Sequence, residues 1–236
     1  MKVNQFIRSS RLLFIFHLSL LLALCLGTQI HAEEQSVKPG INDHYRNPDF
    51  KTWQRRFESP GREVFDMANE IVDALQIKPG MQIADIGAGT GLFSRRFAER
   101  LNGTGRVYAV DISKAFVANI KQQAKQAGLK NISGIVNTAK STGLTKDSIE
   151  LAFICDTYHH FEYPKAMLSS IHQALRNNGR LAVIDFRKDP KLSSDWVMGH
   201  VRADRQTVRR EIEAAGFRYL RDEDMLQSNY FMLFQK

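Results

Sequence analysis

Hydrophobic positions change their period along the chain, and the changes mark helices and strands. Apolar residues three and four positions apart predict an amphipathic helix at 62–76, which Pro79 and Gly80 end. Beyond it, short apolar runs alternate with segments of helical spacing. The expected strands are 81–86, 106–110, 132–136, 149–155 and 180–186, then 217–220 and 229–234. The expected helices are 92–101, 113–127, 164–175, stopped by residues 177–179, and 204–215.

Strands that alternate with helices predict a parallel sheet covered on both faces, with ligands at the carboxyl ends of the strands. The last two strands have no helix between them, so they form a hairpin that places one antiparallel strand in the sheet. We therefore expect an α/β fold with a doubly wound, mostly parallel, seven-stranded Rossmann-like sheet.

The first 32 residues have a different pattern from the rest. Lys2, Arg8 and Arg11 precede an apolar run of about 15 residues, and small and polar residues follow up to Ala32. This order is typical of a secretory signal peptide, and the run is short for a membrane span of about 20 residues. We expect a cleaved leader and an exported, periplasmic or secreted protein. The alternative is an N-terminal anchor, which would be the chain's only attachment to a membrane.

Composition narrows the function classes. The chain has 236 residues and a formal net charge of +8, of which the leader carries three basic side chains. The remaining charge is mild and dispersed, so we expect no nucleic-acid partner. Cys155 alone remains outside the leader, in an apolar run, where it is expected to be a small buried hydrophobe.

A glycine-rich segment follows the first strand and precedes a helix. Gly87 permits a sharp exit from the strand, Gly89 permits close approach of a ligand, and Gly91 permits tight packing of the helix against the strand. The third glycine of a dinucleotide motif would stand at position 92, which is Leu92. Asp85 lies inside the motif, where a carboxylate repels a pyrophosphate and attracts a cationic ligand.

Asp111 ends the second strand, where an acidic side chain can accept hydrogen bonds from both hydroxyls of a ribose. Its alternative role is to cap the next helix, a task it could share with Ser113.

From residue 75 to residue 187 the chain resembles class I S-adenosylmethionine-dependent methyltransferases. The glycine loop with Asp85, the acid Asp111 and the strand segments IELAFICDTYHHF and ALRNNGRLAVIDF carry the resemblance, and the final hairpin fits the family's seventh strand. It implies S-adenosyl-L-methionine as cofactor and a methyltransferase domain at 62–236. It does not specify the methyl acceptor, for which we expect a small molecule attacked in line.

The resemblance also implies roles for single residues. Asp85 would hold the ammonium group of the cofactor, Asp111 its ribose, and Ile112 would lie against adenine. The cofactor's amino-acid part would pack on the glycine loop, and the adenine amino group would meet the residues after the third strand. The residues expected at the amino-acid part are Gly87, Ala88, Gly89 and Gly91. Those expected at the adenine amino group are Asn137 and Thr138, and Asn137 departs from the Asp that the family commonly has there.

The acceptor side of the site is less specific. Asp156 ends the fourth strand and would face the methyl group. His159 or His160 can act as a catalytic base, and the alternative is that this turn only holds the loop. Residues 33–61 combine a linker with an aromatic arm, which is either a lid over the pocket or a fixed packing segment. Methyl transfer depends most on positioning, so a site without a base would also be consistent.

Two other functions compete with this interpretation. A nicotinamide oxidoreductase is opposed by Leu92 and by Asp85. A non-catalytic module that binds the same nucleoside is favoured by the leader, because a methyl donor made in the cytosol is scarce outside the cell.

Overall fold

The computed structural model describes residues 34–236, which form one unit; the leader expected at 1–32 lies outside the described residues. One seven-stranded sheet runs through this unit in the order β3-β2-β1-β4-β5-β7-β6. Its strands are β1 (Gln82–Ile86), β2 (Arg106–Asp111), β3 (Ile132–Val136), β4 (Ile149–Cys155), β5 (Leu175–Phe186), β6 (Arg218–Asp222) and β7 (Asn229–Gln235).

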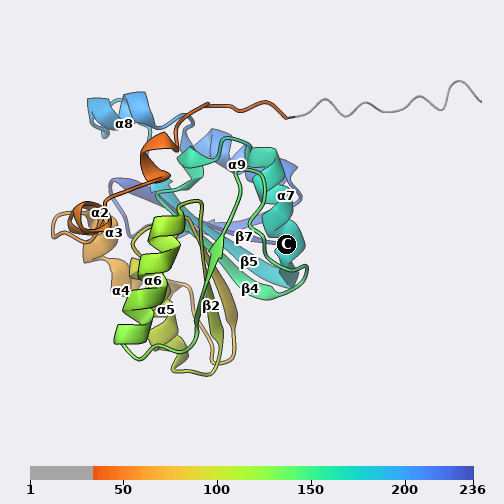
Figure 1. Ribbon diagram of the computed structural model, residues 1–236. Helices are drawn as coiled ribbons and strands as arrows, with labels where there is room; N and C mark the ends of the chain where they lie inside the picture. The colour runs from red at the N-terminus through yellow and green to blue at the C-terminus, as the bar shows by residue number, and fades with distance from the viewer. Residues whose placement is uncertain (1–33) are drawn as a thin grey trace, which may run out of the picture. The chain divides into compact units, whose positions relative to one another are not determined.

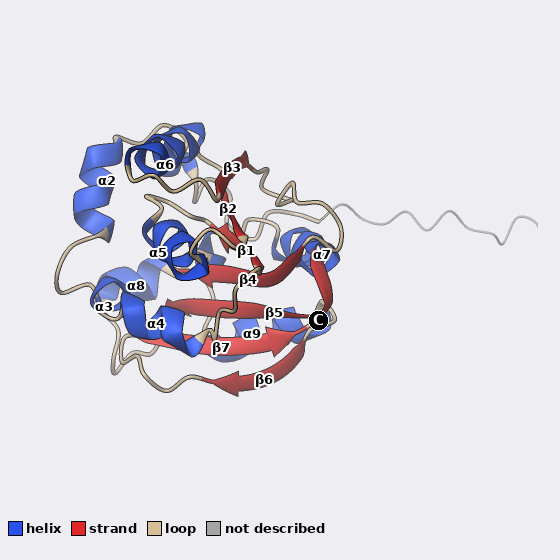
Figure 2. Ribbon diagram, turned by 90° about the horizontal axis from the view of Figure 1, so that it is seen from below, coloured by secondary structure: helices blue, strands red, loops and turns tan. Residues whose placement is uncertain are grey.

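The strand order places a crevice where β1 lies beside β4. From β1 the chain adds β2 and β3 on one side, and β4 and β5 follow on the other, all in parallel (Figures 1 and 2). β7 is antiparallel to both β5 and β6. This confirms the expected mostly parallel sheet with one antiparallel strand, and the carboxyl ends of β1 and β4 mark the ligand-binding edge.

The two faces of the sheet pack against different helices. In β4, Leu151 and Phe153 face a core with α3 (Glu63–Asp66), α4 (Ala68–Ala74) and α5 (Leu92–Leu101). Ala152 and Ile154 face a core with α7 (Pro164–Ala174) and α9 (Arg205–Ala214). Figure 2 shows α4 and α5 in front of the sheet and α9 behind it. Strands buried on both faces explain the continuous apolar runs in the sequence.

Sequence signals mark the start of several helices. Ser113 caps α6 (Lys114–Gln126) by accepting a hydrogen bond from the backbone of Phe116, and Asp204 caps α9 in the same way. Pro164 stands at the start of α7. The predicted helices 92–101, 113–127, 164–175 and 204–215 are therefore confirmed to within one residue at each end.

The single helix expected at 62–76 is wrong. The segment forms α3 and α4, which meet at Met67 with φ −95° and ψ 15°. Contacts outside the helix fix the first turn: the Glu63 carboxylate accepts the backbone N–H of Ser228 at 2.9 Å, and Asp66 accepts that of Gly61 at 2.9 Å. The first turn is thus tied to the loop before β7 and to Gly61, contacts that the helical periodicity of the sequence does not record.

The fifth strand is longer than expected, because it begins at Leu175 and passes through the predicted stop at 177–179. Asn178 takes the left-handed φ of 62°, and the Gly179 carbonyl accepts the backbone N–H of Lys236 at 2.9 Å. The turn residues are therefore held in the sheet by the end of β7.

Four short elements have no counterpart in the prediction. They are η1 (Asp43–Tyr45), α2 (Phe50–Phe57), η2 (Tyr158–His160) and α8 (Asp195–His200). All four contribute residues to one pocket or to its rim. Within residues 34–236 no helix has the length and hydropathy needed to cross a membrane.

Candidate active site

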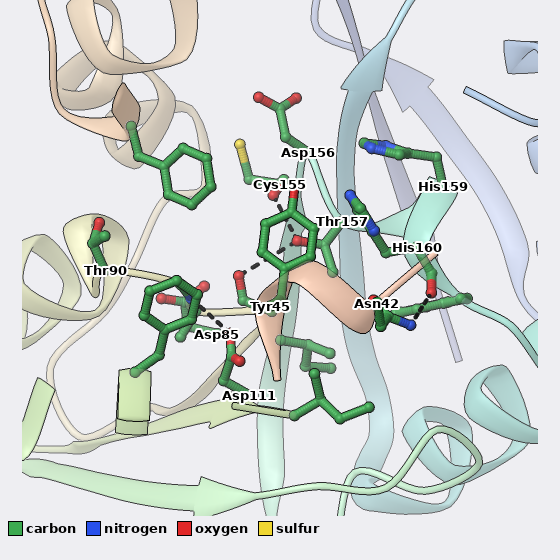
Figure 3. Close-up of a pocket in the computed structure, with 18 of the residues that line it drawn as sticks. Asn42, Tyr45, Asp85, Thr90, Asp111, Cys155, Asp156, Thr157, His159 and His160 are labelled. Carbon is green, nitrogen blue, oxygen red and sulfur yellow. Dashed lines mark hydrogen bonds between the residues drawn. The ribbon is translucent and has the colours of Figure 1, made fainter. Parts of the chain in front are cut away.

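A cavity of about 310 Å³ opens at the carboxyl ends of β1 and β4. Figure 3 shows Asp85 and Asp111 together on one side of Tyr45, and His159 and His160 on the other. All five residues line this cavity. The structure therefore brings the two carboxylates and the two histidines of the sequence analysis into one pocket.

The glycines of the loop are required partly by contacts with neighbouring side chains of the protein. Gly87 has φ 75°, and a Cβ there would lie 2.2 Å from the Thr157 side chain. A Cβ on Gly91, at φ 82°, would lie 2.8 Å from Ile120 of α6, so the close packing there is between two helices and not between helix and strand, as the sequence had led us to expect. Gly89 faces Phe57 of α2, which a Cβ would meet at an ordinary 3.5 Å. Its left-handed φ of 54° is the stronger constraint.

Asp111 connects the glycine loop to the start of α6. Its Oδ2 accepts the backbone N–H of Gly89 at 2.8 Å, and its Oδ1 accepts that of Ser113 at 2.8 Å. Two carboxylate oxygens offer about four acceptor positions, so both can still receive a ribose hydroxyl. The helix cap is Ser113 itself, which removes capping as the reason for the acid at 111.

Asp85 is buried and its Oδ2 accepts a hydrogen bond from the Ser94 hydroxyl at 2.6 Å. Burial raises the pKa of Asp85 to about 7, and the nearby charge of Asp111 adds to this shift. Burial likewise raises the pKa of Asp111 to about 6. Two desolvated carboxylates that repel each other are stabilised in the ionised form by a cation.

Residues that follow β2 and β3 also lie at the pocket, Ile112 directly after β2 and Asn137 with Thr138 after β3. Ile112, Asn137 and Thr138 all line the cavity. The Asn137 amide nitrogen donates to the Thr138 carbonyl at 2.8 Å, whereas its Oδ1 is buried and has no hydrogen-bond partner among the described residues. A free acceptor at this place suits an amino group of a ligand, such as that of adenine.

Asp156 lines the cavity but is engaged by the protein. Its Oδ2 forms an ion pair with Arg62 at 2.6 Å, and its Oδ1 accepts from the Asn229 amide at 2.6 Å. It has a left-handed φ of 48°. Burial raises the pKa of the Asp156 carboxyl, and Arg62 opposes that shift. These contacts give Asp156 the role of joining α3 and β7 at the pocket.

His159 is held by an acidic partner that the sequence analysis did not identify. Its Nδ1 lies 2.7 Å from Oδ1 of Asp185, and its backbone N–H donates to Oδ2 of the same residue at 2.9 Å. Both side chains are almost fully buried. A carboxylate at Nδ1 fixes the tautomer in which Nδ1 carries the proton, so that Nε2 keeps a lone pair.

The His160 imidazole forms a hydrogen bond with the backbone of Ile41 and not with a carboxylate. Its Nδ1 is buried without a hydrogen-bond partner within residues 34–236. Burial lowers the pKa of His160 to about 2, and that of His200, at the end of α8, to about 4. Both imidazoles are therefore neutral at pH 7.

Aromatic residues of the arm cover the pocket. Tyr45 packs edge-on against His160 with ring centroids 4.9 Å apart, and Trp53 lies between Tyr45 and Phe57. The Asn42 side chain donates to the His160 carbonyl at 3.0 Å. The arm thus contacts the histidine turn directly.

The sequence analysis missed the lining residues Asn42, Thr157 and Trp196, and also Asp185 and His200, which contact His159 behind the cavity wall. Asp185 could have been found, because it stands at the carboxyl end of β5 just as Asp111 does at the end of β2. His200 and Trp196 lie on a short helix without a clear period, and no local signal marks them.

The pocket and the sheet agree with one protein family. The model of the methyltransferase domain family matches residues 77–229. The chain belongs to this methyltransferase family. The class I methyltransferase resemblance stated from the glycine loop and the strand ends is thereby confirmed, together with its fold.

Individual relatives are distant. A ubiquinone/menaquinone biosynthesis C-methyltransferase of Wigglesworthia glossinidia brevipalpis is 24% identical over 51% of this chain and 48% of its own length. Aklanonic acid methyltransferase of Streptomyces sp. strain C5 is 29% identical over 53% and 58%. The chain therefore matches only about half the length of these relatives. A methyltransferase structure from Aquifex aeolicus shares the fold, with TM-score 0.71, 21% identity and coverage of 80% and 98%.

Proposed function

We propose that this protein transfers the methyl group of S-adenosyl-L-methionine to a small organic acceptor. The observation that carries the proposal is the pair of buried carboxylates, Asp85 and Asp111, on the two sides of a tight glycine loop. Burial raises the pKa of both carboxyls, and their hydrogen bonds offset that cost only in part; a cationic ligand would offset it further, whereas a pyrophosphate would increase it.

The pocket residues fit this cofactor in three places. Asp85 lies where it can hold the ammonium group, and Asp111 keeps acceptor positions for the ribose hydroxyls. The free Oδ1 of Asn137 suits the adenine amino group. When bound, the cofactor supplies an electrophilic methyl group on a sulfonium, and the protein's own contribution is to position it and exclude water.

The acceptor would lie in the aromatic half of the cavity. Tyr45, Trp53 and His160 form a largely apolar wall there, which suits a small molecule with a flat or apolar body. The names of the relatives, which refer to ubiquinone, menaquinone and aklanonic acid, also favour a small organic acceptor.

His159 is the side chain best arranged to take a proton from the acceptor. Asp185 orients its imidazole and stabilises the charge that forms when Nε2 accepts a proton. Asp156 has both oxygens engaged by Arg62 and Asn229, so we assign it to holding the pocket together.

Binding and turnover test the proposal separately. Calorimetry should show S-adenosylhomocysteine binding more tightly than NADH, and the opposite order would contradict the proposal. Labelled methyl groups should then pass from the cofactor to small molecules of a cell extract. Binding without any transfer would favour the alternative, a non-catalytic module that binds the same nucleoside.

We also propose that the protein is exported, on the basis of the charge and hydropathy order of residues 1–32. A reporter fused after Lys236 should be active outside the cytoplasm. Activity confined to the cytoplasm would show that the segment does not direct export.

A further inference from the structure

Three histidines meet at the rim of the pocket, although they come from two distant parts of the chain. His159 and His160 lie on η2, after β4, and His200 ends α8, beyond β5. One ligand atom from each lies within 4.8 Å of those of the other two. We propose that this cluster is a binding site for one divalent transition-metal ion, with Zn²⁺ as the representative.

The arrangement of the rings is that of imidazoles around a common centre. Ring centroids are 4.2 Å apart for His159 and His160, 5.1 Å for His159 and His200, and 5.3 Å for His160 and His200. Three imidazoles bound to one zinc ion place their centroids about 4.5 to 5.2 Å apart. The ligand nitrogens of a tetrahedral zinc site lie about 3.3 Å apart, so the three nitrogens, which lie within 4.8 Å of one another, would each have to move by about 1 Å or less to reach one ion.

Two of the ring nitrogens in this cluster lack a hydrogen-bond partner among the described residues. Nδ1 of His160 and Nε2 of His200 are buried, and neither has a hydrogen-bond partner in the part of the chain that the structure describes. A buried polar atom without a partner costs about 1–3 kcal/mol, so a purely packed cluster would be expected to turn these nitrogens toward donors. An imidazole nitrogen that carries no proton has a lone pair that a metal ion can accept.

Asp185 supplies the supporting contact that a metal-binding histidine usually has. Its Oδ1 lies 2.7 Å from Nδ1 of His159, which leaves Nε2 as the nitrogen that can bind the metal ion. Histidine ligands almost always donate their second N–H to a carboxylate or carbonyl in this way. The negative charge of Asp185 also offsets the positive charge of Lys38, whose ammonium group donates a hydrogen bond to the carbonyl of His200.

The ligand set selects the class of metal. Three imidazole nitrogens suit Zn²⁺ and its neighbours in the first transition row, whereas Mg²⁺ and Ca²⁺ require oxygen ligands. His159 and His160 line the cavity, so a fourth coordination position would face it. Three protein ligands and one open position are typical of catalytic rather than structural zinc.

An ion at this place would change how the acceptor is activated. It would occupy Nε2 of His159 and bind the acceptor's heteroatom, lowering the pKa of that group. This consequence rests on the proposed methyl transfer, whereas the metal site itself does not.

Metal binding can be tested without cofactor or acceptor. The full chain, carrying no histidine tag and stripped with a chelator, is titrated with Co²⁺ while its visible absorption is followed. We expect one equivalent to give the strong bands of a four-coordinate site, and Zn²⁺ to displace it. An unchanged spectrum in the wild-type chain would overturn the proposal.

Matched variants separate ligation from packing. His200→Phe removes the metal-binding nitrogen but keeps a ring that can stack on Trp196. The ring centroids of His200 and Trp196 are 4.5 Å apart in the structure. We expect this variant to keep the melting temperature of the stripped wild type and to bind Co²⁺ at least 100-fold more weakly. Asp185→Asn should weaken binding by about 10- to 100-fold. His172→Ala, on α7, should bind as the wild type does.

Two further outcomes keep the result independent of the proposed function. If His200→Phe binds Co²⁺ as tightly as the wild type, the site lies elsewhere and the proposal is wrong. S-adenosylhomocysteine binding is measured on the same samples. Metal binding without nucleoside binding would overturn the proposed function and leave the metal site in place.

Discussion

The two halves of the pocket are built in different ways. In the nucleoside half, Asp85, the glycine loop and Asp111 come from two adjacent parallel strands and lie within 27 residues of sequence. In the histidine half, η2, the end of β5, α8 and the N-terminal arm converge from across the chain. The first half is a local motif, and the second exists only in the folded molecule.

This difference separates what each half does. The nucleoside half presents buried carboxylates with raised pKa values, which suit a cation, whereas the histidine half presents neutral imidazoles and aromatic rings. The first arrangement favours binding of a charged cofactor. The second favours an apolar acceptor and the handling of its proton, so damage to one half should leave the task of the other intact.

The largest expected effect is on turnover, from the histidine half. His159→Gln removes the imidazole that Asp185 orients and should reduce methyl transfer by about 100-fold, the low end for a general base. Affinity for S-adenosylhomocysteine, measured by calorimetry, should stay within about twofold. His172→Gln on α7 is the control. A parallel loss of nucleoside affinity would show that the two halves are not separable.

The next effect is on binding, from the nucleoside half. Asp111→Ala removes a charged acceptor that serves the ribose and also orders Gly89 and Ser113. Hydrogen bonds to a charged group contribute about 1.5–3 kcal/mol, so S-adenosylhomocysteine should bind at least about tenfold more weakly. Asp224→Ala, an exposed acid outside the pocket, should change nothing. Unchanged affinity in Asp111→Ala would remove the ribose assignment.

The same contrast explains which features the sequence could predict. Hydrophobic period, Ser113, Asp204 and Pro164 act within one turn of their own helix, so helix ends were predictable. The break at Met67 depends on bonds from Glu63 to the start of β7, which no local pattern records. The glycine loop and both carboxylates were likewise visible as a motif.

The histidine half was predictable only in part. His159 and His160 stand together after a buried strand and attract notice as titratable groups. Their partner Asp185 and neighbour His200 follow 26 and 41 residues after His159, and only the order of the strands places them there. Asp156 was expected to face the methyl group, but Arg62 and Asn229 engage both of its oxygens. Gly89 was expected to leave room for a ligand, and in the structure Phe57 lies next to it.

A smaller effect should come from pH, and it tests the charge of the nucleoside half. Burial places the pKa of Asp85 at about 7, so the group is largely neutral at pH 6 and largely ionised at pH 8. Only the ionised form attracts an ammonium group. Affinity for S-adenosylhomocysteine should therefore rise by about tenfold across this range. Asp85→Asn should bind weakly at both pH values. A pH slope that survives this substitution would assign the titration to another group.

The smallest effect on nucleoside affinity should come from Arg62, which lies between the arm and the pocket. Arg62 pairs with Asp156 and also donates to the Phe57 carbonyl at 2.7 Å, so it joins α2 to the pocket. Arg62→Met leaves Asp156 buried with only Asn229 as partner, which should lower the free energy of unfolding by about 1–2 kcal/mol. Nucleoside affinity should change by less than about threefold, measured beside the exposed control Arg55→Met.

Limited proteolysis of the same variant decides between the two roles of the arm. If residues 34–61 are a lid, Arg62→Met should expose them to protease, and S-adenosylhomocysteine should restore protection. A fixed packing segment would instead stay protected until the whole protein unfolds, because Glu58 remains paired with Arg95 at 2.8 Å. Protection that depends on the ligand would show that the histidine half is completed only when the nucleoside half is filled, which joins the two regions in one catalytic cycle.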